Sequence, residues 1–157
     1  MHIVLCLRDE PMAERLRAAL SEHKHTVEIV PDSAFLEYAA SRACVGLLIA
    51  DSMLPGDESE PHTLKAAIPL IKQVNADLPI FALSSIKSVA NICDVLQAGA
   101  DDYLTVSFSF RELCCRIEAL ARRRRSHRYT EIPRFIVGHL RVGIATADRD
   151  WARKLCR

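Results

Sequence analysis

The sequence predicts an α/β protein built on a doubly wound, five-stranded parallel sheet. Short apolar runs alternate with helical patterns over the first 125 residues, and this alternation is typical of βα units joined by right-handed crossovers. Several of these runs also end in acidic or hydroxyl residues, and such strand ends are where an open sheet meets its ligands. At 157 residues, half of them apolar, the chain can bury one substantial core and carry a short appendage.

Five apolar runs are predicted to be the strands. Residues 3–7 and 26–30 have the strand pattern, the second with a half-exposed face. Residues 45–50 are apolar throughout, which indicates a strand buried on both faces. Residues 79–83 and 103–106 complete the predicted sheet.

Helical spacing of apolar residues predicts helices between these strands. The first covers residues 12–22, with Pro11 suited to its first turn, and the second covers residues 31–40. The third covers residues 64–74. Pro69 inside it is expected to kink or break the helix, because proline lacks a backbone donor.

The last two predicted helices have clear boundary signals. Residues 89–98 are followed by Gly99, a typical helix-ending residue. Ser109 and Glu112 form a capping-box pattern, after which a last helix is expected to end at the arginine run 122–125.

The composition is that of a globular domain. No segment reaches the roughly 18 apolar residues that a membrane span needs, and the first residues lack the basic start of a secretion signal. We therefore expect a cytoplasmic protein that does not enter a membrane. The net charge of +1 hides an uneven distribution, because residues 1–115 carry 9 basic and 16 acidic side chains whereas residues 116–157 carry 12 and 4. The basic tail would attract phosphate backbones without reading a base sequence.

The change in composition predicts the domain organisation. We expect a first domain over residues 1–121 and a basic linker over residues 122–133. Residues 134–157 are expected to form one or two short strands, a C-terminal β appendage too small to bury a core of its own.

Three predicted strand ends bring candidate chemistry to one edge of the sheet. Asp9 follows the first strand, Asp51 the third and Ser84 the fourth. Two carboxylates and a backbone carbonyl suit a hard cation such as Mg²⁺, which would let a phosphate approach Asp51 and form an aspartyl phosphate. The Ser84 hydroxyl would then bond a phosphoryl oxygen. Taken singly, each of these residues more often caps a helix or solvates a strand end, so the prediction depends on all three being together.

Three motifs give the chain a family resemblance over residues 1 to about 125. They are Leu48-Ile49-Ala50-Asp51-Ser52-Met53-Leu54-Pro55-Gly56, Ala98-Gly99-Ala100-Asp101-Asp102-Tyr103-Leu104 and Phe108-Ser109-Phe110-Arg111-Glu112-Leu113. With them the chain resembles bacterial two-component response regulators, and specifically receiver domains of the winged-helix (OmpR/PhoB-like) class. Residues 134–157 more weakly resemble the opening strands of the winged-helix domain, and the chain stops before a recognition helix.

The resemblance implies a flavodoxin-like receiver fold in a non-enzymatic protein, which takes part in phosphorelay signal transduction controlling transcription. It implies that Asp51 is the phosphoacceptor, that Asp9, Asp51 and the Met53 carbonyl are Mg²⁺ ligands, and that Ser84 and Tyr103 are the switch residues. The implied partners are a sensor histidine kinase and, through a complete winged-helix domain only, DNA.

Two positions depart from the family pattern. The family has two adjacent acids after the first strand, where this chain has Arg8 before Asp9, and it has Lys-Pro after the fifth strand, where this chain has Val106-Ser107. A guanidinium beside Asp51 and Asp9 would form bidentate bonds to carboxylates and repel Mg²⁺. We therefore hypothesise a degenerate receiver that binds Mg²⁺ poorly and is phosphorylated weakly or not at all, its conformation being set by an Arg8–Asp51 pair.

The resemblance also implies a homodimer. Receivers of this class pair through the fourth helix, the fifth strand and the last helix, and five charged side chains are candidates for that surface: Asp101, Asp102, Arg111, Arg116 and Arg122. Residues 91–94 of the fourth helix replace basic residues of the family, so a more apolar contact is expected, with a solvated charged face as the alternative.

Other functions stay open on the sequence alone. A conventional receiver would still accept phosphate at Asp51 with the help of Mg²⁺. A metal-dependent phosphohydrolase would use Asp51 with Asp9, and it is weakened by Val106 and by the lack of a second general acid near Asp51. A flavodoxin-type binder would need a phosphate-cradling glycine loop after the first strand, and residues 8–11 contain no glycine.

Overall fold

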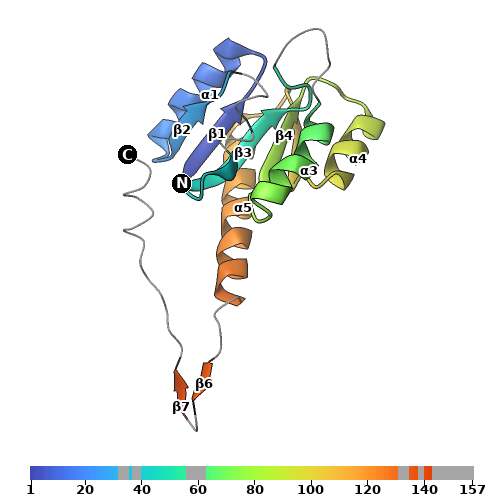
Figure 1. The fold of residues 1–157 in the computed structure, drawn as a ribbon. Helices are drawn as coiled ribbons and strands as arrows, with labels where there is room; N and C mark the ends of the chain where they lie inside the picture. The colour runs from blue at the N-terminus through green and yellow to red at the C-terminus, as the bar shows by residue number, and fades with distance from the viewer. Residues whose placement is uncertain (32–35, 37–39, 56–62, 131–134, 138–139, 143–157) are drawn as a thin grey trace.

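Five parallel strands form the centre of the molecule, in the order β2-β1-β3-β4-β5 (Figure 1). The computed structural model describes residues 1–31, 36, 40–55, 63–130, 135–137 and 140–142. The strands are β1 (His2–Cys6), β2 (Thr26–Ile29), β3 (Val45–Asp51), β4 (Ile80–Ser84) and β5 (Asp102–Thr105). The α/β class and the five-stranded parallel sheet are confirmed, and each observed strand lies within one residue of its predicted bounds.

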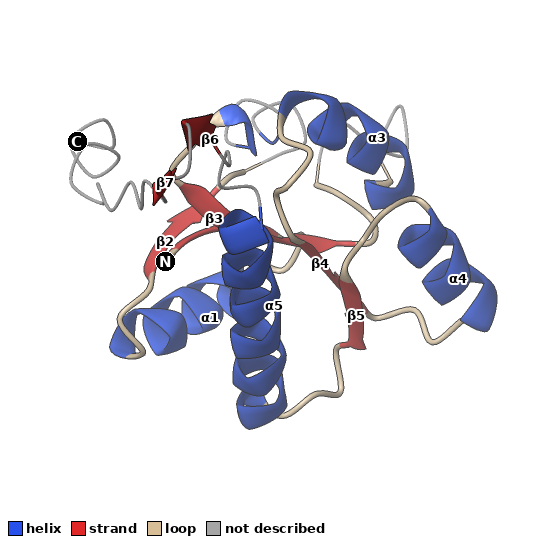
Figure 2. Ribbon diagram, turned by 90° about the horizontal axis from the view of Figure 1, so that it is seen from below, coloured by secondary structure: helices blue, strands red, loops and turns tan. Residues whose placement is uncertain are grey.

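Helices cover both faces of this sheet (Figure 2). Helices α1 (Glu10–Glu22) and α5 (Phe110–Thr130) lie on one face, and α3 (Leu64–Val74) and α4 (Val89–Gln97) lie on the other. Alternate residues of β3 enter the two apolar clusters: Leu47 and Ile49 pack on the α1–α5 side, whereas Leu48 and Ala50 pack on the α3–α4 side. This strand is apolar throughout because a parallel strand between two helical layers has no solvated face.

Capping side chains mark the starts of α1 and α5. The Asp9 carboxylate accepts the backbone N–H of Met12 at 2.9 Å, so α1 begins at Glu10, two residues before the predicted start. The Ser109 hydroxyl accepts the backbone N–H of Glu112 at 3.1 Å, as the capping-box pattern predicts. The Glu112 carboxylate instead bonds Arg116 one turn further on, so only half of the box forms.

Helix α5 extends further than the sequence analysis predicted. It runs to Thr130, so the arginine run 122–125 lies inside the helix and not at its end, and residues 122–130 of the predicted linker are helical. Arginine is a good helix former, and the first proline after the run is Pro133. Beyond it, β6 (Phe135–Val137) and β7 (Leu140–Val142) pair antiparallel, as the predicted short strands of the C-terminal appendage.

Two other predictions concern helices. Of the predicted helix over residues 31–40, only Pro31, Leu36 and Ala40 are described, and Leu36 and Ala40 are both buried. Within the described part of the chain, none of the helices has the length and apolar content that crossing a bilayer requires.

Helix α3 continues through Pro69, where a kink or break was expected. Its buried face consists of Leu64, Ile68 and Ile71, whereas Pro69 is exposed. Packing of the buried face holds the helix together, and the carbonyl that proline leaves without a donor can bond water.

We therefore expect Pro69→Ala to stabilise the protein. Alanine restores the missing backbone hydrogen bond and removes the ring clash, which is worth about 1–3 kcal/mol in a helix interior. Chemical denaturation with urea checks this. Pro11→Ala is the matched control, because a proline in the first turn of α1 costs no hydrogen bond, and an equal gain in both variants would contradict the explanation.

Candidate functional site

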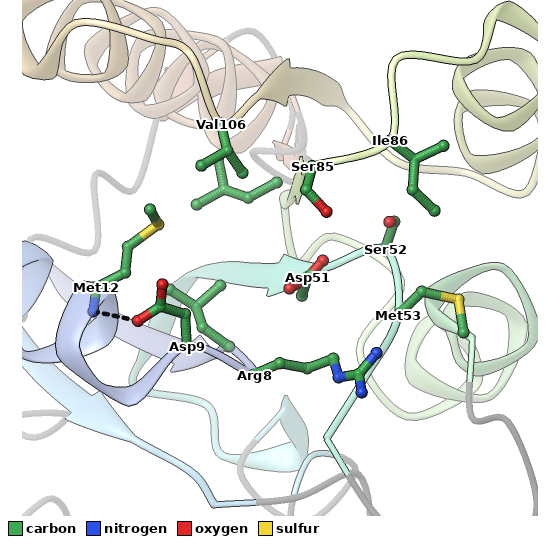
Figure 3. A pocket seen from close by; sticks show the side chains of 11 residues that line it. Arg8, Asp9, Met12, Asp51, Ser52, Met53, Ser85, Ile86 and Val106 are labelled. Carbon is green, nitrogen blue, oxygen red and sulfur yellow. Dashed lines mark hydrogen bonds between the residues drawn. The ribbon is translucent and has the colours of Figure 1, made fainter.

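The carboxyl ends of β1, β3 and β4 meet at a pocket of about 350 Å³ (Figure 3). The register pairs Cys6 of β1 with Ala50 of β3, and Asp51 with Leu83 of β4, so the residues that follow these strands come together. The polar lining consists of Arg8, Asp9, Asp51, Ser52 and Ser85, and the apolar lining consists of Leu7, Met12, Met53, Leu83, Ile86 and Val106. The predicted convergence of Asp9 and Asp51 therefore occurs, with six apolar side chains beside them.

Asp51 is the last residue of β3 and is partly buried. Burial raises the pKa of its carboxyl above the usual aspartate value, and the backbone N–H of Met53 and the Arg8 guanidinium offset this rise only in part. The groups that stabilise the ionised Asp51 carboxylate therefore do not fully compensate for its desolvation.

Arg8 does not form the predicted bidentate pair. Among the described acids none makes an ion pair with it, and Figure 3 shows its guanidinium extending past Asp51 toward Met53. The side chain is exposed, so remaining hydrated avoids the desolvation that a close pair with Asp51 would cost. Its charge nevertheless lowers the pKa of Asp51 from a distance.

Asp9 lines the pocket while it caps α1. One carboxylate oxygen accepts the Met12 N–H, as the dashed line in Figure 3 shows, which leaves the other oxygen for the pocket. In the described residues no three His, Cys, Asp or Glu side chains come together as metal ligands. The described lining thus holds two carboxylates, one of them engaged in a cap, together with one guanidinium, whose charge would repel a cation bound at the carboxylates.

Ser84 lies behind the pocket and not in its lining. Its hydroxyl is 2.6 Å from the hydroxyl of Ser52, and it accepts the backbone N–H of Ile86 at 3.0 Å. The neighbouring Ser85 lines the pocket instead. The switch role predicted for Ser84 stays a prediction, and in this structure the hydroxyl is engaged elsewhere.

Tyr103 is buried against the α3–α4 side of the sheet. Its hydroxyl donates to the carbonyl of Ile86 at 3.2 Å and accepts from the side-chain amide of Asn91 at 2.9 Å. This second predicted switch residue is thus fixed at its hydroxyl end by the β4–α4 loop and by α4 itself. Its switch role also stays a prediction.

The residues after β5 present no charge to the pocket. Val106 lines it, whereas Ser107 is exposed, with its hydroxyl 3.5 Å from that of Thr105. Arg8 is therefore the one cation in the lining that the described residues form.

Several charges predicted for a dimer face have partners within the chain. Arg116 bonds both oxygens of Asp102 at 3.1 Å and also pairs with Glu112. Asp101 accepts the backbone N–H of Ile80 at 2.9 Å and pairs with Lys72 at 3.4 Å. The remaining two candidates, Arg111 and Arg122, are exposed on α5.

Sequence reasoning missed Ser52, Ser85, Ile86 and Asn91 as parts of this region. Hydroxyls at positions 52 and 85, each next to a predicted site residue, were a usable signal. The part played by Ile86 had none, because its backbone groups make the contacts and every residue carries the same groups.

Comparison with known proteins identifies the fold and the relatives. No family model matches the chain. The transcriptional regulatory protein RprY of Bacteroides fragilis is 31% identical over 138 residues, covering 88% of this chain and 56% of RprY. The response regulator PmrA of Pseudomonas aeruginosa is 30% identical over 149 residues, covering 93% and 62%. The chain therefore spans about half the length of the curated relatives it matches.

A solved structure gives the same result for the first part of the chain. The beryllofluoride-activated N-terminal receiver domain of Klebsiella pneumoniae RstA superposes with a TM-score of 0.65 at 25% identity, covering 78% of this chain and 99% of that domain. Three observations agree with a receiver fold. The sheet has five parallel strands with helices on both faces, its central strand ends in an aspartate, and the relatives are response regulators. The curated relatives of this chain are therefore response regulators, and its fold is that of their receiver domains.

Proposed function

We propose that this chain is the receiver part of a transcriptional regulator whose phosphorylation pocket is degenerate, so that Asp51 is phosphorylated weakly or not at all. Val106 carries the proposal, because it stands in the pocket lining where the resemblance implies a lysine. An apolar side chain there supplies no charge to a phosphoryl group. The partner of the full protein is a sensor histidine kinase or another protein that reads the receiver surface, and DNA is bound through a complete winged-helix domain.

The electrostatics of Asp51 support this proposal. A phosphoacceptor must be an ionised nucleophile whose charge is screened while a phosphate approaches. Here burial raises the pKa of Asp51, and the one cation in the pocket lining is the exposed guanidinium of Arg8, which makes no ion pair with it. Arg8 also opposes Mg²⁺ by repulsion, so we propose low Mg²⁺ occupancy at Asp9, Asp51 and the Met53 carbonyl.

The competing functions have less support. A conventional Mg²⁺-dependent receiver would need the charges that Arg8 and Val106 have replaced. A metal-dependent phosphohydrolase is not favoured by the relatives, which are response regulators.

Reaction with acetyl phosphate tests the degenerate pocket. In the presence of Mg²⁺ we expect intact-mass spectrometry to find no stoichiometric gain of a phosphoryl group on the wild-type chain, since neither a bound cation nor a lysine neutralises the incoming phosphate. A stoichiometric gain that disappears in Asp51→Asn would refute the proposal.

Restoring the two departures provides the positive arm. The double variant Arg8→Asp with Val106→Lys places a third carboxylate and a lysine at the pocket, and we expect it to gain the phosphoryl group that the wild type does not. The matched control is Arg15→Asp with Val106→Lys. It retains the new lysine, and it makes the same change of arginine to aspartate on the exposed side of α1. Equal labelling of both double variants would show that Arg8 has no part in the effect.

The buried carboxyl also predicts a pH-dependent stability. Burial disfavours ionised Asp51 in the folded state, whereas the unfolded chain ionises it freely, so its charge lowers stability at neutral pH. Asp51→Asn should therefore raise the melting temperature at about pH 7. The gain should shrink as the pH falls through the raised pKa of Asp51 and vanish below the usual aspartate range, where both states are protonated.

Thermal melts over that pH range check this prediction. Asp77→Asn is the control, because Asp77 is an exposed loop carboxylate away from the pocket. A gain of the same size in both variants, or one that grows toward acid pH, would contradict the assignment to Asp51.

We further propose a homodimer through α4, β5 and α5. Arg111, which is exposed on α5, is the best probe of this interface. Reversing the charge of Asp102 would be less specific, because it would also break the bond between Asp102 and Arg116 within the chain. Arg111→Glu should lower the apparent mass measured by light scattering from dimer toward monomer, whereas Arg15→Glu on α1 should not. A dimer unaffected by Arg111→Glu would argue for another interface.

A further inference from the structure

Two side-chain hydroxyls hold the peptide groups of one loop residue, Ile86. Its backbone N–H donates to the hydroxyl of Ser84 on β4 at 3.0 Å, and its carbonyl accepts from the hydroxyl of Tyr103 on β5 at 3.2 Å. Its side chain meanwhile lines the pocket that contains Asp51, as Figure 3 shows. The β4–α4 loop is thus fixed from two neighbouring strands at the residue where it passes the pocket.

Ser52 determines where the Ser84 hydroxyl points. The two hydroxyl oxygens are 2.6 Å apart, and both residues are buried, with 3% of Ser52 and none of Ser84 exposed. Because Ser84 accepts the Ile86 N–H, its own proton is free to go to Ser52. Ser52 directly follows Asp51, so this bond joins the end of β3 to the loop and keeps the Ser84 hydroxyl behind the pocket lining.

Asn91 bonds the Tyr103 hydroxyl as Ser52 bonds the Ser84 hydroxyl. Its side-chain amide donates to the Tyr103 hydroxyl at 2.9 Å, so that hydroxyl accepts one bond and donates the other to Ile86. Asn91 lies in the first turn of α4, whose start is capped by Ser88. The hydrogen bonds therefore run without interruption from the residue after Asp51, through Ser84, Ile86 and Tyr103, to α4.

We propose that Ser52 and Asn91 are positioning residues that lock this loop: Ser52 through the Ser84 hydroxyl, and Asn91 through the Tyr103 hydroxyl. The lock sets the position of α4 relative to β5 without a phosphoryl group. It deepens the proposed function and rests on it, because a receiver that is not phosphorylated must have its signalling surface set by contacts within the chain.

Amide hydrogen exchange followed by NMR tests the Ser52 side on the full chain without acetyl phosphate. The Ile86 N–H should exchange about tenfold faster in Ser52→Ala, because the Ser84 hydroxyl loses its buried partner and turns away. Ser52→Thr keeps a hydroxyl and should restore slow exchange. Ser109→Ala is the matched control, since it also removes one serine hydroxyl bond but at the start of α5.

The Asn91 side has a separate spectroscopic readout. In protein labelled with 3-fluorotyrosine, the ¹⁹F signal of Tyr103, assigned by its loss in Tyr103→Phe, should shift or broaden in Asn91→Ala and stay unchanged in Gln97→Ala on the same helix. Asn91 is only partly buried, so this variant tests the lock even where Ser52→Ala does not fold.

Different results would overturn the proposed lock and the proposed degenerate pocket. Unchanged Ile86 exchange in a folded Ser52→Ala, or an unchanged Tyr103 signal in Asn91→Ala, overturns the lock whatever acetyl phosphate does. Phosphorylation of the wild type overturns the proposed function, while the exchange and ¹⁹F results continue to report on the lock.

Discussion

The arrangement of this molecule depends on a carboxylate that is partly buried and incompletely neutralised. Parallel β3 is covered on both faces by helices, so it delivers Asp51 to the edge of the sheet with little solvent around it. Such a group requires positive charge in contact, a bound cation or protonation. Burial therefore raises the pKa of Asp51, the exposed Arg8 offsets this rise only in part, and Val106 adds no charge to the lining.

The fold was predictable because its signals are local and repeated. Each strand lies within one residue of its predicted bounds, since continuous apolar runs bounded by polar residues specify buried parallel strands. The convergence of Asp9 and Asp51 was predicted because the carboxyl ends of parallel strands lie at the same edge of a sheet. The end of α5 was not predictable in the same way, because an arginine run suits the end of a helix and its interior equally well.

The internal geometry of the site was less predictable. Arg8 was expected to contact Asp51 because the two charges attract, but the attraction is weak for a side chain that can remain hydrated, and desolvation decides the outcome. Ser84 was placed in the pocket by its position at a strand end. The structure turns its hydroxyl to Ser52, a choice that depends on which of several nearby partners satisfies a buried hydroxyl.

The proposed properties of the pocket and of the β4–α4 loop are consistent with each other. The switch roles that the resemblance implies would require the Ser84 hydroxyl and the Tyr103 ring to be free to move. Here the Ser84 and Tyr103 hydroxyls each make two hydrogen bonds within the chain, and moving either one would leave Ile86 or Asn91 without its bond. Buried polar groups are costly to leave unpaired, so the loop favours one arrangement. The proposed degenerate pocket and the proposed lock of the loop therefore act in the same direction, since both would hold the α4 surface in a single state.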